Sequence, residues 1–198
     1  MSSSPDPDRT SGDRDATRPR ETAQRDIAPE RDHHCEPRRG GTGLPGGDDP
    51  AVGHALIGRL GLEPLEGEGG HVRRMYADDN MSSAIYLMIA PDFSALHRLD
   101  TPEVYHWQGG APVRMLVLDP DGSSRRVVLG PDLEAGQVLQ TVVPAGSWQG
   151  SRPEGAWSLL GLTLAPPFRF DGFALGTRAE LRDGWPGAAA EIDELTRG

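Results

Sequence analysis

Short apolar stretches, separated by strong turn signals, fill the sequence from Arg73 to Leu175. Asp119-Pro120-Asp121-Gly122 is typical of these turns, because proline fixes one backbone angle and glycine permits a positive one. Stretches of this length and spacing are typical of the strands of a β-sandwich or β-barrel. We expect about eight strands, at 83–89, 94–99, 103–108, 113–118, 125–129, 138–143, 156–164 and 170–175. The fold class is therefore predicted to be mainly β.

Helical signals flank this β region on both sides. Apolar residues recur at helical spacing over 51–60, after the acidic cap and first-turn proline of 48–50 and before Gly61. The segments 177–183 and 188–197 have the pattern of two short helices separated by Trp185-Pro186-Gly187. We expect one short N-terminal helix and two short C-terminal helices.

Residues 1–47 differ in composition from the rest of the chain. They are rich in Ser, Pro, Gly, Asp and Arg, and Ile27 and Leu44 are almost their only large aliphatic side chains. Such a segment buries too little apolar area to offset the entropy lost on ordering. We predict a disordered polyampholyte tail at 1–47 and one domain at 48–198.

The charge of the chain excludes several classes of function. The net charge is −10, which disfavours binding to a nucleic-acid backbone. All 20 basic residues are arginine, so lysine Schiff-base chemistry and a P-loop lysine are excluded. The sequence has neither the apolar core of a signal peptide nor an apolar run long enough to span a membrane. We expect a cytoplasmic protein that binds neither nucleic acid nor membrane.

Polar side chains gather in the expected strands on either side of Pro102. His97, Glu103 and His106 fall within ten residues, and Gln149 follows in the segment 142–150, which has the pattern of a strand ending in a turn. Side chains alternate across a strand, so Glu103, Tyr105 and Trp107 share one face while His106 lies on the other. Both Glu103 and His106 can face the barrel interior only if a bulge intervenes.

These residue types suit two kinds of site. Imidazole, carboxylate and amide groups bind divalent metals, and the same groups hold a sugar through hydrogen bonds. His97, Glu103 and Gln149 are therefore the candidate metal ligands, and His97, Glu103 and His106 the candidate catalytic residues. The alternative is structural: His97 is a satisfied core histidine and Glu103 caps a turn.

Several motifs together resemble the cupin 5 family of the cupin superfamily, an RmlC-like family long labelled a domain of unknown function. The resemblance covers about residues 51–197 and rests on Glu68-Gly69-Gly70, Leu96-His97-Arg98-Leu99, Glu103-Val104-Tyr105-His106-Trp107, Val143-Pro144-Ala145-Gly146-Ser147-Trp148-Gln149-Gly150 and Ala165-Pro166-Pro167-Phe168. It implies a double-stranded β-helix, the cupin jelly roll, related to sugar-nucleotide epimerases. It also implies a homodimer.

The resemblance implies an incomplete metal site. His97 stands at the place of the first metal histidine of cupins, and Glu103 matches their glutamate. Leu99 occupies the place of the second histidine and Gln149 that of the last, where this family tends to carry glutamine. A divalent metal would therefore have different ligands here, and His106 is the natural substitute if its strand bulges.

Four further residues are candidate ligand-binding residues. Arg73 aligns with an arginine of the family and is expected either to clamp a phosphate or carboxylate or to form a surface ion pair. Tyr86, Tyr105 and Trp107 lie on expected strands, where such residues either form core or line a pocket and stack on a sugar.

Two functions remain open at this point. The first is a small-molecule-binding cupin that acts as an isomerase or epimerase on a sugar or sugar-phosphate with a divalent metal. His97 would be the base or a ligand, assisted by Glu103 and His106, while Arg73 would hold the charged end. The alternative is a non-catalytic module that binds a metabolite, which the missing metal ligands favour. A purely structural dimer is a third possibility.

Overall fold

The computed structural model describes residues 46–197, so the tail predicted at 1–47 lies outside the described residues except for Gly46 and Gly47. Gly47 is buried, and its carbonyl accepts hydrogen bonds from the amides of Ala156 at 2.6 Å and Trp157 at 3.2 Å. Among the described residues, Gly47 therefore already hydrogen-bonds to the domain predicted at 48–198.

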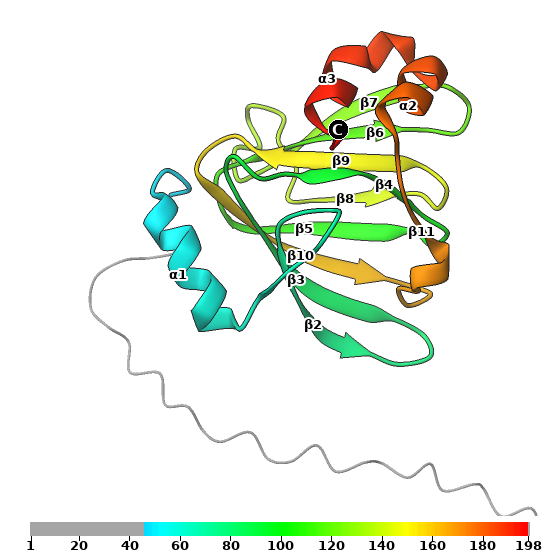
Figure 1. Ribbon diagram of the computed structural model, residues 1–198. Helices are drawn as coiled ribbons and strands as arrows, with labels where there is room; N and C mark the ends of the chain where they lie inside the picture. Colours follow the sequence, from blue (N-terminus) through cyan, green and yellow to red (C-terminus); the bar gives the residue numbers. More distant parts are fainter. Residues whose placement is uncertain (1–45, 198) are drawn as a thin grey trace, which may run out of the picture. The chain divides into compact units, whose positions relative to one another are not determined.

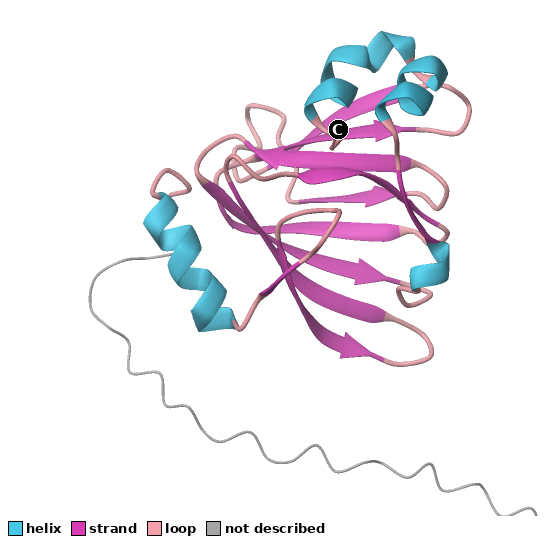
Figure 2. Cartoon of the chain, viewed as in Figure 1, coloured by secondary structure: helices cyan, strands magenta, loops and turns pink. Residues whose placement is uncertain are grey.

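Two antiparallel sheets and a few short helices make up the described chain (Figures 1 and 2). In chain order the elements are α1 (Pro50–Leu60), β1 (Glu63–Pro64), β2 (His71–Ala77), β3 (Ser82–Ile89), β4 (Ser94–Leu99), β5 (Glu103–Gly110), β6 (Val113–Leu118), β7 (Ser124–Leu129), β8 (Gln140–Val143), β9 (Trp148–Pro153), β10 (Trp157–Leu164), the 3₁₀ turn η1 (Phe170–Gly172), β11 (Phe173–Leu175), α2 (Arg178–Gly184), the 3₁₀ turn η2 (Pro186–Ala188) and α3 (Ala189–Glu194). One sheet has the order β1-β2-β3-β10-β5-β8, and the other has the order β11-β4-β9-β6-β7. The predicted mainly β jelly roll with short flanking helices is confirmed.

Helix α1 begins and ends as its sequence predicts. The Asp49 side chain accepts a hydrogen bond from the Ala51 amide at 2.9 Å, and Gly61 ends the helix with φ of +61°. Leu56 packs with Leu87 and Trp157, so the helix covers the outer face of β3 and β10. None of the helices within residues 46–197 is long and apolar enough to cross a membrane.

Strand β9 is the main element that the sequence did not predict. Its polar sequence from Trp148 to Pro153 lacks alternation, yet Trp148 to Ser151 are all buried. The strand is central, between β4 and β6, and both of its faces are covered. Gln149 and Ser151 face the other sheet, while Trp148 packs against the C-terminal segment. The prediction of a turn near Gly150 is therefore wrong, because Gly150 lies within β9.

Two other segments differ from the expected pattern. Strand β2 was not among the expected strands, because its arginines and its mostly exposed residues lack a clear apolar face. The strand predicted at 170–175 begins only at Phe173, since residues 170–172 form η1.

Both faces of β6 are largely buried, and each face contributes to a different hydrophobic cluster. Met115 and Val117 point between the sheets, where Tyr86 and Tyr105 join the same core cluster. Leu116 and Leu118 point outward, into a second cluster with Leu181, Ile192 and Leu195 of the C-terminal segment. The C-terminal helices thus cover the five-stranded sheet, as Figure 1 shows.

Removal of the Leu181 side chain should destabilise the domain strongly. Leu181 is 0% exposed in the second cluster, and replacing a buried leucine by alanine leaves a cavity that costs about 2–5 kcal/mol. Urea unfolding of Leu181→Ala should show this loss in the free energy of unfolding. Leu133→Ala, at a residue 60% exposed, is the matched control and should change it little. Equal losses in the two variants would contradict this packing.

Candidate functional site

His97 lies on β4, directly opposite Gln149 of β9 in the sheet register. The imidazole is 2% exposed, and its Nδ1 lies 2.8 Å from the carbonyl oxygen of Ala95. A carbonyl only accepts, so Nδ1 carries the proton and donates it. The other nitrogen, Nε2, is then an acceptor in the neutral ring, and the Gln149 amide nitrogen lies 3.2 Å from it.

Glu103 comes from β5 of the other sheet and meets the same amide. Its Oε2 accepts a hydrogen bond of 2.6 Å from Gln149 Nε2 and one of 3.0 Å from the Tyr105 hydroxyl. Glu103 is 4% exposed. The side chain of Gln149 therefore bridges an imidazole on one sheet and a carboxylate on the other.

Burial sets the proton affinities of this group. Desolvation raises the pKa of Glu103 from 4.5 to about 7, and the nearby Glu68 charge adds to this, while His97 and the hydrogen bonds from Tyr105 and Gln149 act in the opposite direction. Burial, together with the charges of Glu103 and Glu68, holds the pKa of Tyr105 well above its usual range. Glu103 can therefore exchange a proton near neutral pH, while Tyr105 remains a donor.

Glu68 is a site residue that the sequence analysis did not select. Its Oε1 lies 4.0 Å from His97 Nδ1 and accepts a hydrogen bond of 2.9 Å from the Ser94 hydroxyl. His97 thus has a carboxylate near each of its ring nitrogens, Glu68 on one side and Glu103 beyond the Gln149 amide on the other. The motif Glu68-Gly69-Gly70 was visible in the sequence, but nothing in it indicates which strand its carboxylate approaches.

A clamp built around Arg197 holds the segment that carries Glu68. The Arg197 Nη2 donates to the Glu68 carbonyl at 3.0 Å, to Asp92 Oδ1 at 2.6 Å and to the Phe93 carbonyl at 2.8 Å. Asp92 Oδ2 in turn accepts from the Gly70 amide at 2.6 Å. Gly70 has φ of +70°, and a β-carbon there would lie 2.6 Å from the Tyr86 hydroxyl, so only glycine fits.

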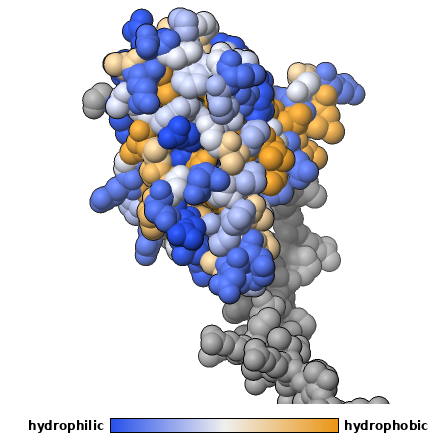
Figure 3. All heavy atoms as spheres, turned by 90° about the vertical axis from the view of Figure 1, so that its right-hand side faces the viewer, coloured by the Kyte–Doolittle hydropathy of each residue, from blue (hydrophilic) through white to orange (hydrophobic). Residues whose placement is uncertain are grey.

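A cavity of about 240 Å³ opens beside these groups. Its polar wall consists of His97, Glu103, Glu66, Glu68, Arg74, Ser82 and Ser83, and its apolar wall of Leu65, Val72, Ala84, Leu99, Leu162, Leu164, Phe168, Phe170 and Phe173. The Phe173 ring stacks on His97, with ring centroids 5.5 Å apart. Figure 3 shows the side of the molecule where η1 lies, and there hydrophobic groups interrupt a mainly hydrophilic surface.

His106 does not join the site. Its strand partner on β10 is Gly161, and its Nε2 lies 3.5 Å from the Thr163 hydroxyl. The bulge in the β5–β10 ladder skips Gln108, after His106, so it leaves the alternation at His106 unchanged. His106 therefore stays on the opposite face from Glu103, as side-chain alternation predicts.

The other sequence-selected residues have structural contacts. Arg73 Nη1 donates to the Leu60 carbonyl at the end of α1, at 2.9 Å, and it is the neighbouring Arg74 that lines the cavity. The Tyr86 hydroxyl donates to the Gly69 carbonyl at 2.8 Å. Trp107 Nε1 donates to the Ala111 carbonyl at 3.2 Å, and Trp107 is not among the lining residues.

The residues brought together do not fit a divalent metal. Gln149 presents its amide nitrogen to both His97 and Glu103, and an amide nitrogen has no lone pair to give to a metal. The Gln149 Oε1 atom, which could ligate, is buried and has no hydrogen-bond partner among the described residues. Within residues 46–197 no group of three or more His, Cys, Asp and Glu side chains could hold a metal ion.

Two solved structures share this fold over most of their length. A hypothetical protein from Leishmania major is 26% identical, with a TM-score of 0.66 over 73% of this chain and 98% of its own. A protein from Shewanella oneidensis is 30% identical, with a TM-score of 0.68 over 72% of this chain and 96% of its own. A search of the curated proteins finds no match.

A family model gives the assignment directly. The model described as cupin superfamily (DUF985) matches residues 54–176, which include both sheets and the residues His97, Glu103 and Gln149. The chain therefore belongs to the DUF985 family of the cupin superfamily.

Proposed function

We propose that this cupin binds a small carbonyl compound in the cavity and moves a proton on it, as isomerases and epimerases do. One observation carries the proposal: Glu103 lines the cavity, has a pKa raised to about 7, and is linked through the Gln149 amide to His97. A general base is most effective when its pKa lies near the working pH.

The proposed step is a proton transfer that balances within the substrate. Glu103, ionised, takes a proton from a carbon beside the carbonyl and leaves an enolate. In an α-hydroxy carbonyl compound the hydroxyl proton then moves to the former carbonyl oxygen, and the resulting carboxylic acid returns the abstracted proton to the former carbonyl carbon, so the carbonyl group shifts by one carbon. Inversion of the first carbon by this one carboxyl would require the enolate to turn over in the cavity before the proton is returned. The Tyr105 hydroxyl and the Gln149 amide hold the Glu103 carboxyl through hydrogen bonds, so they orient it for this transfer.

The cavity wall favours an uncharged ligand over a phosphorylated one. Three carboxylates, from Glu66, Glu68 and Glu103, line it together with the single guanidinium of Arg74. Arg73, which was expected either to clamp a phosphate or carboxylate or to form a surface ion pair, instead donates a hydrogen bond to the Leu60 carbonyl at the end of α1. Phenylalanine rings such as those of Phe168 and Phe173 suit the apolar face of a sugar ring. We therefore favour an unphosphorylated sugar, or a similar small carbonyl compound, as the substrate.

The second candidate function is binding without turnover. It is supported by the way the polar groups bond to one another: the Gln149 amide and the Tyr105 hydroxyl already occupy Glu103. A cytoplasmic homodimer is the expectation that accompanies either function.

Replacing Glu103 by glutamine should separate catalysis from binding. Glu103→Gln keeps the shape of the side chain and removes its titratable proton, so proton transfer should fall by about 10²–10⁴-fold while ligand binding persists. The measurement is solvent deuterium incorporation into unphosphorylated aldoses and ketoses, followed by NMR in D₂O. The wild-type rate should rise as pH increases through about 7.

Glu154→Gln is the matched control, because it makes the same chemical change at an exposed position in the β9–β10 turn. Its rate should equal that of the wild type. Sugar binding by wild-type protein with no deuterium incorporation would favour the non-catalytic function.

Glu103 should also make stability depend on pH. Its pKa is raised on folding, so the folded state binds the proton more tightly and the contribution of Glu103 to stability is greatest below about pH 4.5. Between that pH and about 7 the free energy of unfolding should fall by roughly 3 kcal/mol through this group. Urea unfolding at several pH values should show this fall in the wild type and its loss in Glu103→Gln. The same pH dependence in both proteins would show that Glu103 does not carry it.

A further inference from the structure

Two arginines stand side by side on the outer face of the five-stranded sheet. Arg114 of β6 and Arg152 of β9 are direct cross-strand partners. Like charges in directly opposite positions destabilise a sheet, so this pair needs a negative partner. The local positive charge stands out in a chain whose net charge is −10.

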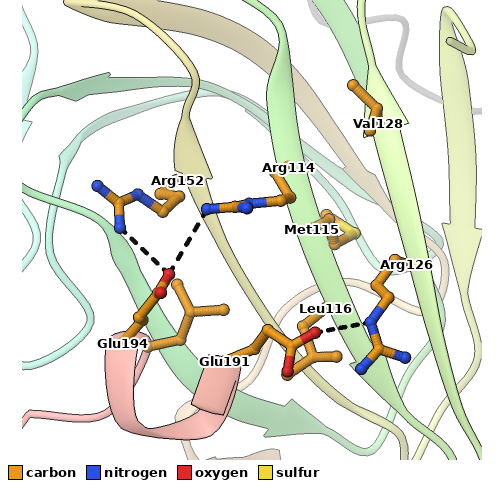
Figure 4. Close-up of a pocket in the computed structure, with 9 residues that line it drawn as sticks. Arg114, Met115, Leu116, Arg126, Val128, Arg152, Glu191 and Glu194 are labelled. Carbon is orange, nitrogen blue, oxygen red and sulfur yellow. Dashed lines mark hydrogen bonds and ion pairs between the residues drawn. The ribbon is translucent and has the colours of Figure 1, made fainter. Parts of the chain in front are cut away.

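Glu194, at the end of α3, supplies one negative charge for the two positive charges. Figure 4 shows both guanidinium groups directed at its carboxylate. Arg152 Nη1 lies 3.3 Å and Arg114 Nη2 lies 3.5 Å from the same atom, Glu194 Oε2. Neither contact is bidentate, and within residues 46–197 neither guanidinium makes another side-chain hydrogen bond. Most of their N–H donors therefore have no protein acceptor in the described part of the chain.

The neighbouring pair on the same helix is much tighter. Arg126 Nε donates to Glu191 Oε1 at 2.7 Å, and this hydrogen bond lowers the pKa of Glu191. Helix α3 is also held on the sheet by Ile192, which is buried in the second cluster with Leu116 and Leu118, so the contact of Glu194 is not needed to hold the helix there.

A cavity of about 200 Å³ lies among these groups, over an apolar floor that includes Leu116 and Val128 (Figure 4). An anion with several oxygen atoms could give each guanidinium two acceptors, whereas Glu194 offers one atom to both. The side chain of Glu194 is 47% exposed, so it can leave for solvent without being buried elsewhere.

We propose that Arg114 and Arg152 form a binding site for a small oxyanion, a phosphate or a carboxylate, which Glu194 occupies from within the chain when the anion is absent. This site lies on the outer face of the five-stranded sheet. His97 and Glu103 line a different cavity, with no lining residue in common. The proposal is therefore independent of the proposed proton transfer.

Removing the charge of Glu194 tests the site, because the anion then has no competitor. In the full chain, Glu194→Gln should bind inorganic phosphate about tenfold more tightly than the wild type does. Calorimetric titration at constant ionic strength measures the affinity, with sodium chloride as the blank. The Nε–Hε NMR signals of Arg114 and Arg152 should shift on titration. A parallel titration with malonate distinguishes a site for carboxylates from one for phosphate.

Asp193→Asn is the matched control, since it removes one negative charge from the same helix, where Asp193 pairs with Arg178 and Arg182 instead. It should leave phosphate affinity unchanged. Adding Arg152→Ala to Glu194→Gln should abolish the gain, while thermal unfolding checks that the double variant is folded. Equal affinities in Glu194→Gln and Asp193→Asn, or no binding above the chloride blank for either anion, would overturn the proposal.

Discussion

The hydrogen bonds of one amide group, that of Gln149, join the two sheets at the candidate site. The amide reaches His97 on its own sheet and Glu103 on the other, so an imidazole and a carboxyl group are held at a fixed separation inside the barrel. Burying a carboxylate is costly unless it is hydrogen-bonded or protonated. The raised pKa of Glu103 follows from this environment, and the proposed proton chemistry depends on it.

The same amide distinguishes this chain from the metal-binding pattern of its superfamily that the resemblance implied. Where that pattern expects histidine, Leu99 lines the cavity with a hydrocarbon side chain and Gln149 presents N–H groups toward His97 and Glu103. Leu99 and Gln149 thus put a hydrocarbon side chain and a hydrogen-bond donor where that pattern expects metal ligands. The proposed proton transfer uses these hydrogen-bonded groups.

Much of this arrangement could be predicted from the sequence, because it follows local rules. Strand alternation placed Glu103 and Tyr105 together and His106 on the opposite face, and the caps of α1 marked its bounds. Central strand β9 could not be predicted in this way, since its polar residues show no apolar face and it is buried by the other sheet and the C-terminal segment. Local patterns also say nothing about contacts between distant parts of the chain. The sequence therefore did not indicate that Glu68 and the three phenylalanines Phe168, Phe170 and Phe173 line the cavity, or that Arg74 lines it and Arg73 does not.

The clamp of Arg197 on the Glu68 carbonyl joins residues 129 positions apart in the chain. One wall of the cavity therefore belongs to no single sheet or hairpin; it exists only where the beginning and the end of the domain meet. A shortened chain could keep every strand of the barrel and still lose the fixed position of the Glu68 carboxylate. In this fold the geometry of the site is a property of the whole domain, and an intact barrel does not by itself imply an intact site.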